Sequence, residues 1–277
     1  MYKPVILLSL LLSILFICGI AEADHFKVLI VISDSSATAE ATALEAFTAV
    51  GGHTFEYEQL NIATGGTRPI AGGVIPAEEV DDGNLNWFDY QILWFAWNAP
   101  GHDGDYFLAG TEEDLLTFVE NGGVIYVSAF DDNFSDQNGK QIGGWMPIED
   151  FPCLVDNTAD SATQITEEGK ATTLFSIPNE LNESDLDALV LDDNFAPASN
   201  EYVALANRTD NGKPAIMMLP YGKGAYVGLC IDARSTFPAA NPVLENMLYY
   251  IANLTVPEAV EPVGKLQGLW GGIKSSY

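Results

Sequence analysis

The sequence predicts an α/β domain built on an open parallel β-sheet with helices on both faces. Short apolar runs rich in β-branched residues recur along the chain, and such runs are typical of strands buried on both faces. Segments whose apolar residues repeat at helical spacing separate these runs, and glycine pairs end the segments. Because the joints are short, right-handed crossovers and parallel pairing are expected.

The first three expected elements are a strand, a helix and a strand. Residues 26–33 (FKVLIVIS) are too few and too β-branched for most helices, so they predict a buried strand. A helix is predicted over about 37–50, because its apolar side chains share one face and Gly51-Gly52 follows. Residues 54–58 predict the second strand.

The same alternation continues with two strands around one helix. Residues 90–96 (YQILWFA) and 124–129 (VIYVSA) predict buried strands. Between them Thr111 predicts a helix cap, and the acidic residues 112–114 lie in the first turn, where negative charge favours the helix dipole. Gly122-Gly123 ends this helix.

The alternation stops after residue 130. Residues 131–200 are rich in Asp, Asn, Gly and Pro and predict a loop-rich insertion with short strands such as 162–165. Beyond it the pattern predicts strands at 202–206, 215–219 and 225–231, the last two joined as a C-terminal β-hairpin, and a helix at 242–253. Residues 255–277 have no sustained period and predict a linker or tail.

The chain is strongly acidic, with a formal net charge of −28 from 39 Asp and Glu against 11 Lys and Arg. Nucleic-acid binding needs a basic face that releases counterions, so this composition argues against a nucleic-acid partner and against an anionic membrane surface. An acidic surplus also hydrates a protein surface and keeps it soluble, which requires no ligand at all.

The first 23 residues predict a secretory signal peptide. One positive charge at Lys3 precedes an apolar run over 5–17, and Ala21-Glu22-Ala23 fits the small-x-small cleavage rule. Cleavage after Ala23 predicts a secreted or periplasmic protein whose domain covers 24–254 and which has no membrane segment afterwards. An uncleaved anchor is the alternative, because the apolar run is at the short limit for a bilayer span.

Two cysteines follow this segment, Cys153 and Cys230. Export permits a disulfide between them. Cys230 lies within an apolar run, however, and a buried thiol is the commoner fate of such a residue. Neither cysteine begins a glycine-flanked turn into a helix, so neither predicts a catalytic thiolate.

Several segments together resemble the class I glutamine amidotransferase-like superfamily, and more closely its trehalose-utilisation (ThuA-like) branch. The resemblance lies in the strand 90–97, the helix that ends at Gly122-Gly123, the strand 124–129, the hairpin 219–228 and the helix from Pro242. It covers about 26–253, with 131–200 matching least. The resemblance implies a flavodoxin-like open parallel sheet and, through the ThuA-like branch, a carbohydrate ligand.

The chain departs from this family where active amidotransferases carry their nucleophile. Those enzymes have a Gly-x-Cys-x-Gly elbow after the strand that here ends at Ala129, and a His-x-Glu pair near the C-terminus. In this chain residues 127–131 read Val-Ser-Ala-Phe-Asp, and no histidine follows His102. A Cys-His-Glu mechanism is therefore absent, and Ser128 lacks the elbow that a serine hydrolase needs.

Ligands of open parallel sheets bind beyond the carboxyl ends of the strands. Polar residues leave those ends here, and they make up the predicted ligand site: Asp34, Ser35, Trp97, Asn98, His102, Ser128, Asp131, Asp132, Asp232 and Arg234. Asp34, His102 and Asp131 are the candidates for catalysis, while Trp97 offers a stacking face and Arg234 an anion clamp. The alternative is that these are ordinary loop residues that cap helices and turns.

The sequence predicts no cofactor, and calcium is the alternative that one pattern favours. Residues 131–138 alternate oxygen donors as calcium loops do, with Asp131, Asn133 and Ser135 as the candidate ligands. This stretch lacks the glycine and the glutamate of an EF-hand, so a solvated acidic loop is the favoured interpretation. No His/Cys cluster predicts zinc, and no glycine-rich loop follows the first strand to hold a nucleotide.

These observations predict an exported, non-catalytic amidotransferase-like domain that binds a small-molecule ligand, a carbohydrate by resemblance. One alternative is a carbohydrate-active enzyme that uses Asp34, His102 and Asp131 as acid and base. The second is a structural component of a surface assembly, with a protein partner held through the exposed aromatics or the tail around Trp270. An enzyme should lose turnover on Asp131→Asn, whereas a binder should lose only affinity.

Overall fold

A mixed sheet of nine strands runs through the part of the chain that the computed structural model describes, which comprises residues 24–32, 35–61, 63–64, 68–69, 86–96, 112–129, 147, 153–154, 162–187, 194–197, 199–230 and 241–255. In spatial order the strands are β2 (Ala49–Val50), β3 (His53–Asn61), β1 (His25–Ile32), β6 (Ile92–Phe95), β7 (Val124–Ala129), β13 (Gly224–Cys230), β12 (Pro214–Tyr221), β11 (Val203–Arg208) and β9 (Thr163–Ile165).

The centre of this sheet is parallel and its margins are antiparallel. Neighbouring strands from β3 through β1, β6 and β7 to β13 pair in parallel. The β2–β3, β13–β12, β12–β11 and β11–β9 pairs are antiparallel. The expected parallel pairing is confirmed for the central strands, and the expected C-terminal hairpin is confirmed as the antiparallel β12–β13 pair. The further antiparallel strands at both margins make the sheet mixed, which the sequence did not predict.

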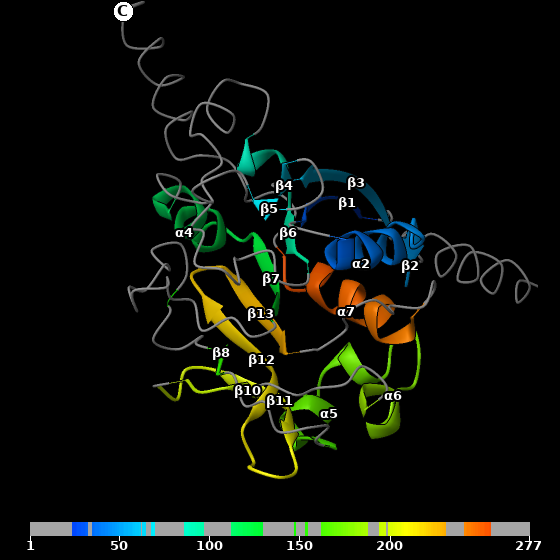
Figure 1. Cartoon of the computed structure of the whole chain (residues 1–277), viewed down its shortest axis with the longest axis vertical. Coiled ribbons are helices and arrows are strands. Elements are labelled where there is room, and N and C mark those ends of the chain that lie inside the picture. Colours follow the sequence, from blue (N-terminus) through cyan, green and yellow to red (C-terminus); the bar gives the residue numbers. More distant parts are fainter. Residues whose placement is uncertain are drawn as a thin grey trace, which may run out of the picture.

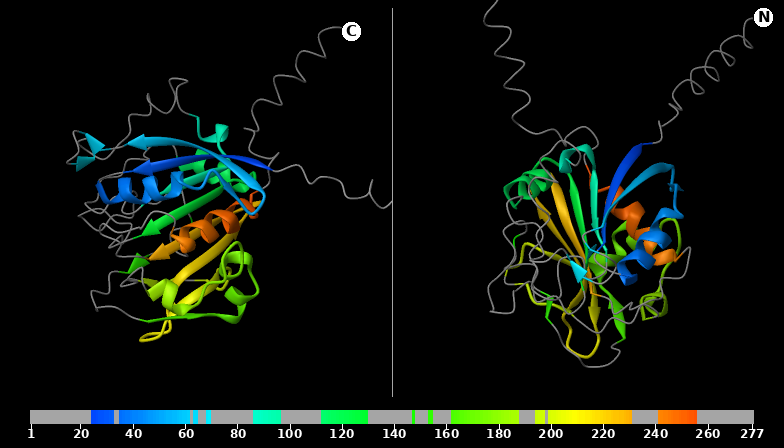
Figure 2. Two further views of the ribbon diagram at one scale, coloured as in Figure 1. Left: turned by 90° about the vertical axis from the view of Figure 1, so that its right-hand side faces the viewer. Right: turned by 45° about the horizontal axis from the view of Figure 1, so that its top comes forward.

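Helices cover both faces of the sheet (Figures 1 and 2). α2 (Ser35–Glu45) and α7 (Pro242–Ala252) lie side by side on one face, and α4 (Glu112–Glu120) lies on the other, beside the 3-10 turn η1 (Trp87–Asp89). Side chains of the strands alternate between the two faces. Thus Ile30 of β1 packs in the core under α2 and α7, whereas Val31 packs in the core under α4.

The ends of α4 and α7 follow from their sequences. Three acidic residues occupy the first turn of α4, as predicted, and its apolar face is buried through Leu115, Phe118 and Val119. Asn241 caps α7, because its side chain accepts a hydrogen bond from the backbone N–H of Val243 at 2.8 Å. Proline at the next position suits the first turn of a helix.

The helix predicted over 37–50 is shorter in the structure. α2 ends at Glu45, and Ala49–Val50 form β2, which turns back onto β3 through Gly51 and Gly52. These glycines have φ angles of 60° and 97°, a left-handed conformation that glycine adopts readily. The glycine pair therefore makes a hairpin turn instead of closing a helix, and the residues before it pair as a strand.

Within 131–200 the structure has short helices as well as short strands. They are α5 (Glu167–Lys170), η2 (Thr173–Phe175), α6 (Glu183–Asp187) and the strand β9, and two-residue strands pair as β8 (Cys153–Leu154) with β10 (Asn194–Phe195). A second such pair, β4 (Ala63–Thr64) with β5 (Arg68–Pro69), follows β3. The helical pieces pack beneath α7 on the face that α2 shares (Figure 1).

One buried side chain attaches this region to α7. Asn246 is fully buried, and its amide nitrogen donates to the carbonyls of Leu174 at 2.8 Å and Asn179 at 2.7 Å. Its amide oxygen accepts from the backbone N–H and the side-chain amide of Asn179, both at 3.0 Å. The buried amide is thus satisfied on both sides, which fixes the position of the loop relative to the helix.

Two further sequence expectations concern the core and the membrane. Cys230 is a buried thiol, in agreement with its apolar surroundings in the sequence. None of the helices in the described part of the chain has both the length and the apolar character to cross a bilayer.

Candidate functional site

The carboxyl ends of the parallel strands meet at one edge of the sheet (Figure 2). β1, β6, β7 and β13 end there at Ile32, Phe95, Ala129 and Cys230. The connections from β1 lead to β3 on one side and, later in the chain, to β6 on the other, so the strand order reverses between β1 and β6. In open α/β sheets this reversal point is where ligands bind.

The structure places two of the predicted ligand residues at this edge. Ser35 is the first residue of α2, and Ser128 is the penultimate residue of β7. The other predicted residues, including all three catalytic candidates, lie outside the described residues: Asp34, Trp97, Asn98, His102, Asp131, Asp132, Asp232 and Arg234. The calcium candidates Asp131, Asn133 and Ser135 lie outside them as well.

Ser128 is fully buried, and its hydroxyl has no hydrogen-bond partner within the described residues. It lies on the face of β7 that is covered by α2 and α7, two residues beyond Tyr126. One residue past the Phe95–Val127 pair, the register brings Ala96 of the neighbouring strand beside it. On β6 and β7 two small side chains, one of them polar, therefore lie in this row, between Ile32 of β1 and Leu229 of β13.

Tyr126 forms the next row inward, stacked on Trp94 with 3.8 Å between the ring centroids. Its hydroxyl is fully buried and, like that of Ser128, has no hydrogen-bond partner among the residues described. Burial raises the pKa of Tyr126 well above its ordinary value, the Glu40 carboxylate raises it further, and the nearby Ser128 hydroxyl acts in the opposite direction. The phenol therefore stays protonated and can donate a hydrogen bond.

The acidic member of this cluster is Glu40 of α2, whose side chain is completely buried. One of its carboxylate oxygens accepts a hydrogen bond from the indole nitrogen of Trp94 at 2.8 Å. A buried carboxylate requires such bonds, because leaving water is costly for a charge. Glu40, Trp94, Tyr126 and Ser128 form what we term the buried polar cluster, directly below the carboxyl edge.

Sequence reasoning missed three members of this cluster. Glu40 interrupts an apolar helix stripe, since it lies four residues before the buried Leu44 and on the same face. Trp94 and Tyr126 carry polar atoms within strands that were predicted to be buried on both faces. A polar atom in a buried position must find a partner, and that requirement is the signal that could have identified the cluster.

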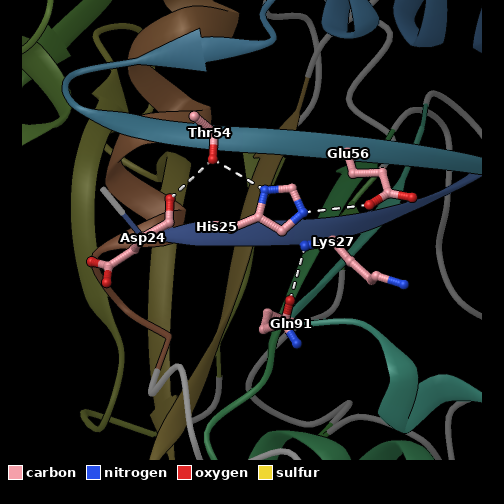
Figure 3. A network of polar contacts seen from close by, with 6 residues as sticks. All are labelled: Asp24, His25, Lys27, Thr54, Glu56 and Gln91. Carbon is pink, nitrogen blue, oxygen red and sulfur yellow. Dashed lines mark hydrogen bonds and ion pairs between the residues drawn. The ribbon is translucent and has the colours of Figure 1, made fainter. Parts of the chain in front are cut away.

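A second polar network lies at the opposite, amino edge of the sheet (Figure 3). His25 Nδ1 lies 3.1 Å from Thr54 Oγ1, and its Nε2 lies 3.4 Å from Glu56 Oε2. The backbone N–H of Lys27 donates to Gln91 Oε1 at 2.8 Å. His25 and Glu56 are each more than half exposed, and exposed pairs of this kind contribute little energy, so the network does not define a buried site.

Metal-ligating side chains are few in both polar networks as far as the described residues show. In the described ranges, no group of three or more His, Cys, Asp or Glu side chains converges in a way that could hold a metal ion. The buried polar cluster has a single carboxylate. In the exposed network the Glu56 carboxylate lies beside one histidine, and Asp24 takes part through its backbone carbonyl, which accepts from Thr54.

Comparison with known proteins identifies similar folds among solved structures but does not identify a family. No family model and no curated protein matches the sequence. Among solved structures, the cytoplasmic protein STM3548 from Salmonella typhimurium is similar with a TM-score of 0.51 and 11% identity, over 83% of this chain and 98% of that one. The cytoplasmic protein STM1381 from Salmonella typhimurium LT2 is similar with a TM-score of 0.50 and 11% identity, over 83% of this chain and 100% of that one.

These similarities establish a mixed α/β fold, and they correct one prediction. Both Salmonella proteins are described as cytoplasmic, which contradicts the secreted or periplasmic location predicted from the N-terminal segment, so export of this chain is not inferred further. Membership of the amidotransferase-like superfamily or of its ThuA-like branch stays a prediction, because identities of 11% speak for the fold alone.

Proposed function

We propose that this protein binds a small, uncharged, polyhydroxylated ligand of the carbohydrate class at the carboxyl edge of its parallel strands, without catalysing a reaction. The observation that carries the proposal is the hydroxyl of Ser128, which is buried at the end of β7 and has no hydrogen-bond partner among the described residues. A buried polar group left unsatisfied costs about 1–3 kcal/mol. Proteins tolerate such a cost where the group serves a ligand.

The strand order supports the placement of this site. β3, β1, β6, β7 and β13 follow one another in the order of a flavodoxin-like sheet, which is also the arrangement that the amidotransferase-like resemblance implies. In that order the ligand crevice lies at the carboxyl ends of β1 and β6. Ala96 follows β6 there, and Ser128 lies beside it on β7.

The chemistry of the chain supports the class of ligand. A net charge of −28 disfavours anionic ligands, whereas an uncharged polyol is indifferent to it. Hydroxyl side chains can both donate to and accept from the hydroxyls of a sugar. The resemblance to the ThuA-like branch points to the same class, and the absence of the amidotransferase nucleophile motif supports binding without turnover.

Thermal unfolding of the full-length protein against D-glucose, D-galactose, D-mannose and trehalose tests the proposal. A ligand that binds only the folded state raises the unfolding free energy by about 2.7 kcal/mol at one hundred times its dissociation constant, which shifts the midpoint by several degrees. We expect a shift with at least one of these sugars. A flat response to all of them would overturn the proposal.

Two variants locate the site. Ala96→Leu adds bulk beside Ser128 and should abolish the sugar-induced shift, measured against the variant's own midpoint without sugar. His25→Ala removes the exposed network at the opposite edge and should leave the shift intact. A shift that survives Ala96→Leu and disappears in His25→Ala would place the ligand at the amino edge instead.

A further inference from the structure

The buried polar cluster contains two hydroxyl groups, those of Tyr126 and Ser128, which lie close to one another on β7. The Ser128 hydroxyl lowers the pKa of Tyr126 by acting as a hydrogen-bond donor toward it. Beyond this mutual interaction, neither hydroxyl has a hydrogen-bond partner within the described part of the chain. They lie in successive rows of the same face of β7, and the outer one is in the last row before the carboxyl edge. The pair therefore has unused capacity to donate and accept at the inner side of the proposed site.

Glu40 influences which chemical group of a ligand can bind to these two hydroxyls. It is buried, accepts the indole N–H of Trp94, and acts electrostatically on Tyr126. A phosphate or carboxylate brought against the two hydroxyls would lose its hydration and would also be repelled by this carboxylate across a medium that screens poorly. An uncharged hydroxyl meets neither penalty, and it can accept from one protein hydroxyl while donating to the other.

We propose that Tyr126 and Ser128 form the inner wall of the ligand site and that Glu40 behind them makes this wall select an uncharged hydroxyl group over a phosphate or a carboxylate. This inference rests on the proposed function and adds the residues that determine specificity. Trp94 has a positioning role, because its ring supports that of Tyr126 and its N–H holds the Glu40 carboxylate.

Calorimetric titration of the full-length protein tests the inference with matched probes. D-glucose, D-galactose and D-mannose are each compared with the corresponding 6-phosphate. We expect binding of at least one neutral sugar and weaker binding of its phosphate. Ser128→Ala and Tyr126→Phe should each weaken sugar binding by about tenfold or more, because the loss of one hydrogen bond to a buried hydroxyl is of that size. Glu40→Gln should reduce the preference for the neutral sugar.

A measurement without ligand separates this role from a structural one. Removal of a hydroxyl whose hydrogen-bonding capacity serves a ligand should leave the unfolding midpoint of Ser128→Ala and Tyr126→Phe nearly unchanged or raised. A fall of several degrees in both variants would show that the hydroxyls serve the fold, and it would overturn the inference.

The outcomes also distinguish the inference from the proposed function. If a sugar binds the wild type and the Ser128→Ala and Tyr126→Phe variants with equal affinity, binding stands and the inner wall is wrong. If the 6-phosphate binds the wild type more tightly than its parent sugar, the role of Glu40 is wrong. If no sugar binds the wild type, the proposed function fails and this inference fails with it.

Discussion

The carboxylate of Glu40 and the indole nitrogen of Trp94 are joined by a hydrogen bond of 2.8 Å inside the core, across the interface between α2 and β6. Both side chains are fully buried. This bond connects a helix that follows β1 to the strand that lies beside β1, so it ties together the two sides of the point where the strand order reverses.

Loss of this bond should destabilise the fold. Glu40→Ala leaves the Trp94 N–H buried without an acceptor, and we expect a loss of about 1–3 kcal/mol in unfolding free energy, with a further loss from the cavity. Glu40→Gln keeps an acceptor and should cost less. Urea denaturation monitored by tryptophan fluorescence measures both, with Glu45→Ala on the exposed end of the same helix as the control. Equal stability of Glu40→Ala and Glu45→Ala would contradict the expectation.

The side-chain amide of Asn246 should contribute more to the free energy of unfolding than that of Asn253 on the same helix. Asn246→Leu preserves volume but leaves backbone groups of Leu174 and Asn179 without the partner that Asn246 provides, so a loss of about 2–4 kcal/mol is expected. Asn253 makes a single exposed bond to the carbonyl of Tyr249, and its replacement by alanine should cost about 0.5–1.5 kcal/mol. Chemical denaturation of the two variants checks this order, and a reversed order would argue that 172–182 is not held by α7.

Two glycines with similar backbone angles should respond differently to alanine. Gly51 and Gly212 have φ angles of 60° and 71°, so each substitution costs about 1 kcal/mol from backbone conformation. A Cβ at Gly51 would also lie 2.2 Å from the ring of Tyr249, which is packed on His53, whereas nothing lies near one at Gly212. Gly51→Ala should therefore be clearly the more destabilising of the two. In a Tyr249→Ala background the two costs should become equal. Thermal unfolding of the wild type, Tyr249→Ala, the two glycine variants and the two double variants measures this.

Stability should fall steeply in strong alkali. Burial raises the pKa of Tyr57, Tyr126, Tyr226 and Tyr250 above the ordinary value of 10, for Tyr250 to about 12. Because the folded state holds these protons more tightly than the unfolded state, their contribution is complete below pH 10 and is lost as the pH rises toward and beyond 12. Phenolate absorbance should rise together with unfolding in this range. Tyr250→Phe should make the decline shallower, and phenolate formation in a chain that stays folded would contradict the prediction.

The sequence predicted elements well where one local cause determines them. β7 was expected at 124–129 and occupies those residues, because an unbroken apolar run between a glycine pair and a polar loop leaves one choice of structure. The end of α2 was missed because Gly51-Gly52 is compatible with a helix end and with a hairpin turn, and the pairing with β3 decides between them. The short helices α5 and α6 were missed because pieces of this length are stabilised by tertiary packing.

The carboxyl edge of the sheet was predictable from the sequence, whereas the buried polar cluster below it was not. Parallel strands imply a carboxyl edge, and Ser128 was correctly expected at the end of a strand that reaches it. The link between Glu40 and Trp94 spans 54 positions in sequence and depends on how α2 lies over the sheet, which no local pattern encodes. Residues such as Asp34 and His102 lie outside the described residues, so their assignment stays a prediction.

The last strand of the sheet has a consequence for how the protein behaves at high concentration. β9 has only three residues, and the backbone N–H of its first residue, Thr163, donates to the carboxylate of Asp187 at 2.8 Å instead of to another strand. An incoming chain that tried to extend the sheet would have to displace that carboxylate and would meet a short template. The β9 edge therefore resists the addition of a strand from another molecule. α6, which carries Asp187, covers this edge and so opposes aggregation through the sheet.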